Sequence, residues 1–461
     1  MNVGIVGGGA AGLAAAYELL RNGHSATVFE RASFLGGQAS TFLVQGVPLE
    51  RGYHHLFTSD RDMIWLIEEL GLSEKLAWLP SRAGLFHQGQ IWKFTTPTDL
   101  LNFRPLTLID RIRLGLITLY LQRIRKWQVL EGVTAAKWLR SRVGRRAYEA
   151  VWEPLLRGKF GQYYDRVGMV WFWGKIALRF ASRGRGMVQE KLGYPMVGFG
   201  KIFDSLGDRI RELGGAVHTN ASVQKVLIND SQGVQGLEVK YVTGEIKIEK
   251  FDAVIITTPS HIVPKLIPEL PKSYSENLSN TTYLAAVLVI LELTDPLSSI
   301  YWLNIADREI PFVGVIEQTN FVPVDRYGGR HIVYLTNYLG SENPLYHASH
   351  AELLKAYLPH LQKINPDFNE SWILKSHYHR EDAAQPVVEP GYAQKIPSHR
   401  TPIRGIYLAN TTQIYPEDRG TNYSVRLGRK VSRMLLMDNG YSSIEELPKA
   451  VIQDSITSSS S

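Results

Sequence analysis

The chain has 461 residues and a net charge of +7, with 51 Lys and Arg against 44 Asp and Glu. Its length favours two domains, and its 44% hydrophobic and 21% charged residues exclude a disordered or fibrous protein. It has no cysteine, which excludes disulfides, zinc–thiolate and iron–sulfur centres, and a cysteine-linked cofactor. The net positive charge is typical either of a basic surface exposed to solvent or of a protein that binds anionic partners. Nucleic acid is not expected, because no basic motif interleaved with aromatics is present.

The first forty residues contain the strongest pattern. Val3–Val6 and Ala26–Phe29 are short apolar runs that predict buried strands, and Leu13–Leu20 between them has helical character. The first strand is followed by the G-x-G-x-x-G sequence Gly7–Gly12, and Glu30 closes the second strand, 18 residues beyond the last glycine. A strand, a glycine turn, a helix and an acid in this register predict a dinucleotide-binding Rossmann-like domain.

Each residue of this pattern has a physical reason. Gly7 permits the tight turn, Gly9 lets the backbone approach a pyrophosphate, and Gly12 allows the helix to pack closely on the strand. The helix amino terminus offers free N–H groups to the phosphates. Glu30 can accept hydrogen bonds from ribose hydroxyls and would repel a 2′-phosphate, which disfavours NADP at this site.

A second glycine pair, Gly36-Gly37, favours FAD, because an extended flavin cofactor needs the chain to pass close by without a Cβ. With this pair the sequence resembles the flavin amine oxidase superfamily, which includes protoporphyrinogen oxidases, carotenoid desaturases and, more distantly, UDP-galactopyranose mutases. The family usually has Arg or Lys after the glycine pair, whereas this chain has Gln38. A positive charge near the cofactor phosphates is therefore expected to come from elsewhere.

Further segments resemble the family in its own order. Glu50–Phe57 is similar to the E-x-G-x-H segment of carotene desaturases and to a segment of the mutases, and Trp152–Gly161 to the P-L-L-x-G-x-F-G stretch of protoporphyrinogen oxidase-like proteins. Ala216–Val226 resembles the second cofactor segment, which implies that the backbone of Val223 contacts the adenine. Asp252–Pro259 resembles the strand that returns to the flavin domain.

The carboxyl-terminal part also follows the family, with one departure. Gly405–Thr412 lies where the family has G-L-Y-x-A-G-D, and Asn410 stands in place of the Gly-Asp pair. Arg419–Gly428 predicts a loop and then a helix capped by Thr421 or Asn422. The resemblance implies that this helix points its amino terminus at flavin N1 and C2=O, where its partial positive charge favours the reduced flavin.

The resemblance implies non-covalent FAD and a set of contact residues. The predicted cofactor-binding residues are Gly7, Gly9, Ala10, Ala11, Gly12, Glu30, Arg31, Gly36, Gly37, Gln38, Val223, Asn410, Thr421 and Asn422. Spacing alone assigns no catalytic residue. The candidates are His54, His55, Tyr378 and Tyr423, and no metal site is expected.

The predicted fold is α/β, a Rossmann-like FAD-binding domain of the glutathione-reductase type interleaved with an α+β substrate domain. The cofactor domain is expected to take residues 1–80, 195–270 and 400–440, the substrate domain residues 81–194 and 271–399, and a partly disordered tail residues 441–461.

One predicted helix is a candidate membrane contact. Leu106–Trp127 has an uncharged stretch, Leu114–Leu121, between basic flanks, which suits an interfacial helix at anionic lipid with Trp127 at the headgroup level. The alternative is a core helix whose arginines extend to solvent. Because no apolar run of about 18 residues and no secretory signal is present, we expect a cytoplasmic protein that is peripheral to the membrane if this helix binds lipid.

The functional prediction is an FAD-dependent oxidase or desaturase. It would transfer a hydride from a substrate C–H to flavin N5, with an apolar isoprenoid- or carotenoid-like substrate and either O₂ or a quinone as electron acceptor. The alternatives are an amine oxidase using O₂, a redox-neutral flavoenzyme similar to UDP-galactopyranose mutase, and a flavoprotein without enzymatic activity.

Overall fold

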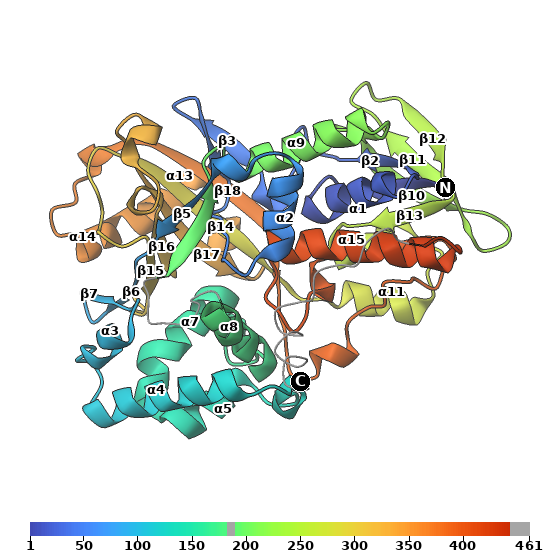
Figure 1. The fold of residues 1–461 in the computed structure, drawn as a ribbon. Coiled ribbons are helices and arrows are strands. Elements are labelled where there is room, and N and C mark those ends of the chain that lie inside the picture. The colour runs from blue at the N-terminus through green and yellow to red at the C-terminus, as the bar shows by residue number, and fades with distance from the viewer. Residues whose placement is uncertain (182–189, 443–461) are drawn as a thin grey trace.

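The computed structural model describes residues 1–181 and 190–442 (Figure 1), so Ser458–Ser461 and most of the predicted tail lie outside the described residues. A parallel sheet of five strands forms the first structural unit, in the order β19-β13-β1-β2-β9. Its strands are β1 (Asn2–Val6), β2 (Ser25–Phe29), β9 (Ala216–His218), β13 (Ala253–Ile256) and β19 (Ile406–Leu408).

Both faces of this sheet are covered, as a parallel sheet requires. Val3, Ile5 and Val28 belong to the core shared with helices α1 (Ala10–Arg21), α9 (Phe199–Glu212) and α15 (Thr421–Asp438). On the other face, Val6 and Phe29 pack against a three-stranded antiparallel sheet. Its strands are β10 (Ser222–Ile228), β11 (Val234–Lys240) and β12 (Ile246–Lys250). These layers confirm the predicted Rossmann-like α/β fold.

A second sheet has seven strands in the order β18-β14-β17-β16-β15-β6-β7. They are β6 (Ala83–His87), β7 (Gln90–Lys93), β14 (Tyr283–Leu293), β15 (Trp302–Ile305), β16 (Gly314–Glu317), β17 (His331–Leu339) and β18 (Ile373–Pro386). Leu353, Tyr357 and Leu361 pack against one face of this sheet. They belong to helices α13 (His350–Tyr357) and α14 (Leu361–Ile364), which follow α12 (Pro344–His347).

A group of helices lies beside the seven-stranded sheet, in the lower left of Figure 1. They are α3 (Pro97–Leu101), α4 (Leu108–Arg123), α5 (Ala135–Val143), α6 (Arg145–Ala147), α7 (Glu153–Phe160) and α8 (Met169–Ala181). The remaining short elements connect these units. They are β3 (Thr41–Val44) paired with β4 (Val47–Glu50), β5 (Leu76–Pro80) paired with β8 (Lys191–Pro195), α2 (Arg61–Glu69), α10 (Val263–Leu266) and α11 (Lys272–Ser279).

The helix predicted over residues 106–127 extends further at its carboxyl end than the helix in the structure. Helix α4 stops at Arg123, because Ile124 adopts an extended conformation with φ −71° and ψ 115°. Trp127 instead begins a separate short turn, and its ring packs edge-on against Tyr415 at 5.4 Å between centroids. Trp127 is therefore a packing residue in this fold, which argues against the predicted headgroup anchor.

The two sheets draw on different parts of the chain. All strands of the parallel sheet fall within residues 1–80, 195–270 and 400–440, and those of the seven-stranded sheet within 81–194 and 271–399. The β5–β8 pair crosses this division, since β8 begins at Lys191. The division into a cofactor domain and a substrate domain stays a prediction.

Candidate flavin site and substrate cavity

The glycine turn after β1 is closely packed. A Cβ on Gly12 would lie 1.9 Å from the Gly7 carbonyl oxygen, and one on Gly7, whose φ is +110°, would lie 2.4 Å from Thr257 Oγ1. Helix α1 begins at Ala10 with Gly9 as its N-cap and no side-chain cap. Its first N–H groups therefore remain available to an anion, as binding a pyrophosphate requires.

Glu30 is held by the backbone around this turn. Its Oε2 accepts a hydrogen bond from Gly8 N at 2.7 Å, and its Oε1 accepts one from Ala32 N at 2.7 Å. Each carboxylate oxygen keeps a second lone pair for a ribose hydroxyl. Glu30 thus fixes the shape of the glycine turn and can still recognise a ribose.

A cavity of about 550 Å³ runs along the glycine turn. Most of the predicted cofactor residues line it, namely Gly7, Gly9, Ala10, Ala11, Glu30, Arg31, Gly36, Gly37, Gln38, Val223, Asn410 and Thr421. Gly12 lies behind the turn, where it packs against Gly7. A glycine cradle, a free helix amino terminus and an acid at the end of β2 fit an FAD adenosine and its pyrophosphate.

The start of α15 differs from the prediction. Gly420 is the N-cap, and neither Thr421 nor Asn422 caps the helix. The Asn422 side chain binds the first turn of α2 instead. Its Oδ1 accepts hydrogen bonds from the N–H groups of Asp62 at 2.9 Å and Met63 at 3.0 Å. The Asn422 side chain thus has a structural role, and its predicted contact with the cofactor stays a prediction.

A second cavity, of about 600 Å³, meets the first. Both cavities are lined by Glu30, Arg31, Gly37, Gln38, His54, Arg380, Glu381, Arg419, Gly420 and Thr421, which we call the junction. A dinucleotide with its pyrophosphate at the glycine turn would place its reactive ring toward this junction. The second cavity is therefore the candidate substrate cavity.

The walls of the substrate cavity are largely apolar. They include Trp152, Leu155, Leu156, Trp171, Phe172, Ile176, Leu178, Leu192, Leu288 and Trp302. Within the Trp171–Trp173 triplet, the first two rings line the cavity, whereas the third is buried and its Nε1 donates to the Leu121 carbonyl at 3.0 Å. Walls of this kind are typical of cavities that bind small molecules.

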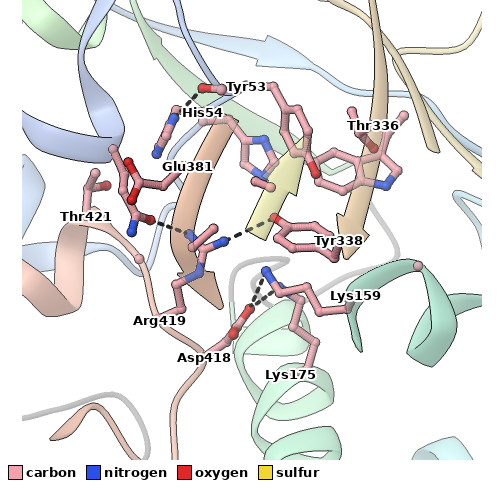
Figure 2. Close-up of a pocket in the computed structure, with 18 of the residues that line it drawn as sticks. Tyr53, His54, Lys159, Lys175, Thr336, Tyr338, Glu381, Asp418, Arg419 and Thr421 are labelled. Atoms are coloured by element: carbon pink, nitrogen blue, oxygen red, sulfur yellow. Dashed lines mark hydrogen bonds and ion pairs between the residues drawn. The ribbon is translucent and has the colours of Figure 1, made fainter. Parts of the chain in front are cut away.

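Arg419 crosses the junction (Figure 2). Its Nη1 donates to Gln38 Oε1 at 3.3 Å, its Nε to Gln385 Oε1 at 3.0 Å, and its Nη2 to the Tyr338 hydroxyl at 3.1 Å. The guanidinium thus stands beside Gln38, where related sequences have Arg or Lys. The sequence gives no signal for this replacement, because the two positions are 381 residues apart.

A charge cluster around a buried carboxylate lies next to Arg419 (Figure 2). Asp418 Oδ2 is 3.0 Å from Lys175 Nζ and 3.5 Å from Lys159 Nζ, and its Oδ1 accepts from Trp171 Nε1 at 3.0 Å. Burial raises the pKa of Asp418, but the neighbouring lysines and Arg419 outweigh it and hold this pKa well below its usual range. Burial also lowers the pKa of Lys159.

Two tyrosines face this cluster with opposite shifts. Burial raises the pKa of Tyr338, but Lys159 and Arg419 outweigh it and lower this pKa to about 8. Lys159 Nζ lies 5.1 Å from the Tyr338 ring centroid. Burial and the neighbouring Tyr338 raise the pKa of Tyr53 well above its ordinary value. Paired groups with pKa values pushed apart are a common feature of reaction sites.

Three of the four catalytic candidates line a cavity. His54 lies at the junction, and His55 and Tyr423 line the substrate cavity. Burial lowers the pKa of His54 to about 4 and that of His55 to about 3. His54 Nδ1 must carry a proton, because it lies 2.6 Å from the Gly52 carbonyl oxygen, which can only accept. Its Nε2 is then a proton acceptor.

Tyr378 lies outside both cavities. Its ring stacks on His350 of α13, at 6.0 Å between centroids, whereas the next residue along β18, His379, lines the substrate cavity. Side chains alternate between the faces of a strand, so adjacent residues on β18 point to opposite sides of the sheet. The sequence analysis placed Tyr378 in the flavin pocket. The register of β18 instead directs its side chain to the opposite face of the sheet, toward α13.

Comparison with known proteins identifies the family. Residues 10–417 match the model described as flavin containing amine oxidoreductase. The chain belongs to this family. It is accordingly a flavin-dependent oxidoreductase with FAD as its cofactor, as the sequence predicts.

The chain is similar to named enzymes of this family at low identity. It is 24% identical to a 15-cis-phytoene desaturase of Glycine max, over 89% of this chain and 75% of that protein. It is 23% identical to a coproporphyrinogen III oxidase of Staphylococcus aureus, over 63% of this chain and 68% of that protein. An oxidoreductase from Methanosarcina mazei has the same fold, with a TM-score of 0.73, 19% identity, and 95% of this chain and all of that chain covered.

Proposed function

We propose that this flavoenzyme dehydrogenates an apolar substrate of isoprenoid or carotenoid type. The observation that carries the proposal is the apolar cavity of about 600 Å³ that opens onto the junction. The similarity to a 15-cis-phytoene desaturase supports the same substrate class. Bound FAD supplies a hydride acceptor, and the chain supplies the surroundings.

Two groups of residues in the cavity have different roles in this reaction. The apolar walls hold the substrate against the junction and exclude water. If a proton leaves as the hydride does, it needs an acceptor at the junction. His54 Nε2 is proposed for this role, since it is an unprotonated nitrogen. The Tyr338 oxygen can take this role only as the phenolate, which forms with a pKa of about 8.

Anaerobic reduction of the flavin tests this proposal. The holoprotein is mixed with liposomes carrying 15-cis-phytoene, and the visible flavin absorption is followed without O₂. Loss of the oxidised band supports isoprenoid dehydrogenation. Reduction only by members of an amine panel, with peroxide release in air, would establish the amine oxidase alternative. Turnover of a nucleotide sugar only after prior flavin reduction, without net consumption of reductant, would establish the mutase alternative.

We also propose that α4 binds an anionic membrane surface. The exposed apolar side chains on and just before this helix are Leu101, Leu108, Ile109, Ile112, Leu116, Leu119 and Tyr120. Exposed basic residues flank them, namely Arg104, Arg113, Arg123, Arg125 and Lys126. This combination matches an interfacial helix on acidic lipid. Within the described residues, no helix combines the length and the apolar composition that a bilayer crossing requires.

Co-sedimentation with liposomes tests the membrane proposal. The double variant Ile109→Ser/Leu116→Ser should lose most of its binding to vesicles of anionic phospholipid. Val242→Ser is the control, because Val242 lies far along the chain on a different unit, and both it and Ile109 are 78% exposed. Equal binding by the double variant and the control would disprove the role of α4.

A further inference from the structure

We propose that the substrate cavity contains an anion-binding subsite formed by Lys159, Lys175 and Arg419, and that the substrate carries a carboxylate or phosphate group on its apolar body. This inference deepens the proposed function and rests on it. It starts from an imbalance of charge at the end of the cavity where apolar walls meet the two lysines.

The two lysines share a single carboxylate. Lys159 and Lys175 both pair with Asp418, so one positive charge is left over. Arg419 adds a further cation, whose three hydrogen bonds go to Gln38, Gln385 and Tyr338. Because Arg419 also lines the cofactor cavity, the FAD pyrophosphate can balance its charge, so the unbalanced charge is that of the lysines. A positive charge without a counterion is costly where solvent access is limited, as at Lys159, whose side chain is 20% exposed; that of Lys175 is 42% exposed. An anionic ligand would remove that cost.

Other carboxyl groups line this cavity, among them Glu381 at the junction (Figure 2) and Asp60. Burial raises the pKa of Glu381 against the effect of Arg419, and it raises the pKa of Asp60 to about 7 against the effect of Lys175. Within the described part of the chain, no salt bridge joins Glu381 to any of the three cations. His54 and His55, with pKa values of about 4 and about 3, are uncharged at neutral pH and add no charge of either sign.

The cofactor phosphates are also in the wrong place to balance it. Lys159, Lys175 and Asp418 line the substrate cavity, and none of them belongs to the lining of the cofactor cavity, whose glycine turn suits the pyrophosphate. The ring of oxidised FAD carries no charge. The excess charge on the lysines therefore faces the space in which a substrate binds.

The arrangement selects for an amphipathic ligand. Trp171 and Phe172 line the cavity beside Lys175 on the same helix, α8, and Leu155 and Leu156 lie one turn before Lys159 on α7. Apolar walls and ammonium groups thus stand side by side. A carboxylate or phosphate can accept charge-assisted hydrogen bonds from both lysines while the chain attached to it packs on the rings.

A series of probes with one chain and three head groups tests the subsite. Geranylgeraniol, geranylgeranoic acid and geranylgeranyl monophosphate are titrated into the FAD-loaded protein, below their micelle concentrations. Binding is followed by quenching of tryptophan fluorescence, since Trp152 and Trp171 line the cavity. We expect at least one anionic probe to bind about ten-fold more tightly than the alcohol, as charge-assisted hydrogen bonds predict. The better anion identifies the group.

The variants Lys159→Met and Lys175→Met should each lower this preference for the anion by about ten-fold. Lys159→Arg should retain it, and Lys137→Met, at an exposed position on α5, is the matched control. The visible flavin spectrum checks that each variant still holds FAD. If either methionine variant fails to fold, the other still decides the question.

The outcomes separate this inference from the proposed function. Equal or tighter binding of the alcohol would overturn the anion subsite and leave the apolar-substrate proposal standing. Binding of none of the probes would contradict both. An anion preference that survives Lys159→Met and Lys175→Met would also overturn the subsite.

Discussion

At the scale of single residues, Glu30 connects the shape of the glycine turn to cofactor recognition. Its carboxylate oxygens accept from the N–H groups of Gly8 and Ala32, on opposite sides of the turn. Removing the carboxylate would leave two buried or half-buried donors unpaired and delete a ribose acceptor. Both effects reduce affinity for FAD.

We therefore expect Glu30→Ala to weaken FAD binding by about ten-fold or more. Flavin fluorescence released on dilution measures the dissociation constant directly. Glu74→Ala, at an exposed position, is the control and should keep the affinity of the parent protein. Unchanged flavin occupancy in Glu30→Ala would remove this residue from the cofactor site.

His54 makes stability depend on pH. Burial holds its pKa at about 4 in the folded protein, below the ordinary value of 6.5. Between these values the unfolded chain binds a proton and the folded protein does not, so stability decreases as pH falls from 6.5 toward 4. The contribution of one such histidine is roughly 1.4 kcal/mol per pH unit.

His54→Asn should remove this contribution, because the amide can keep the hydrogen bond to Gly52 and does not titrate. The slope of unfolding free energy against pH between 6.5 and 5, from urea denaturation, is expected to decrease by roughly 1.4 kcal/mol per pH unit. His347→Asn, at an exposed position, is the control. An identical slope in His54→Asn and the parent would contradict the buried, neutral state of His54.

The site could be predicted from the sequence where it is local. The glycine turn, Glu30 and the pair Gly36-Gly37 follow one another within forty residues, so a pattern can identify them. The charge cluster could not be found in this way, because Lys159 and Asp418 are far apart and meet only through the packing of separate units. The predicted place of Tyr378 in the flavin pocket was wrong for a related reason, because the register of β18 decides which face of the sheet its side chain occupies.

At the scale of elements, α15 packs on α1 at one face of the parallel sheet. Glu18 of α1 is buried and accepts from Arg429 Nε at 2.9 Å and from Arg433 Nε at 2.6 Å. A Cβ on Gly428 would lie 2.1 Å from the Ala11 carbonyl oxygen, in the first turn of α1. The contact between the helices therefore reaches directly to the turn that holds the pyrophosphate.

Gly428→Ala should force the helices apart and destabilise the protein by about 1–3 kcal/mol. Because the displaced turn belongs to the cofactor site, FAD affinity should decrease as well. Gly115→Ala on α4 is the matched control, since its Cβ would meet nothing closer than 3.9 Å, and it should be neutral or stabilising. Melting temperature and flavin retention measure the two effects. Equal melting of both variants would refute the close contact.

Elements with strong local signals were predicted well. Helical character indicated α1, a loop with capping residues indicated α15, short apolar runs indicated β1 and β2, and the family resemblance implied β13. Their ends were less certain, as α4 shows by stopping at Arg123. The cap of α15 was also misplaced, because the side chain of Asn422 serves a different helix. Such choices depend on tertiary partners that no local pattern contains.

At the scale of the whole molecule, the junction is formed by residues of both sheet units. Arg419 precedes α15 and hydrogen-bonds to Tyr338 of β17 and Gln385 of β18, so the junction joins both units. A ligand that fills this junction binds the folded protein alone and must stabilise it by linkage.

We expect FAD at 100 times its dissociation constant to raise the free energy of unfolding by about 2.7 kcal/mol. Urea denaturation of the deflavinated protein at increasing FAD concentrations measures this shift. Circular dichroism and tryptophan fluorescence should change together, because the ligand joins the units. Stabilisation seen by only one of these probes would show that the units unfold independently of each other.

The pairing of α1 with α15 also bears on how the protein is made. Synthesis produces the glycine turn and the Glu18 carboxylate first, and their partners Arg429 and Arg433 more than four hundred residues later. The cofactor cavity is lined by residues from Val6 to Leu427, so its wall is complete only after the first turns of α15 have been synthesised.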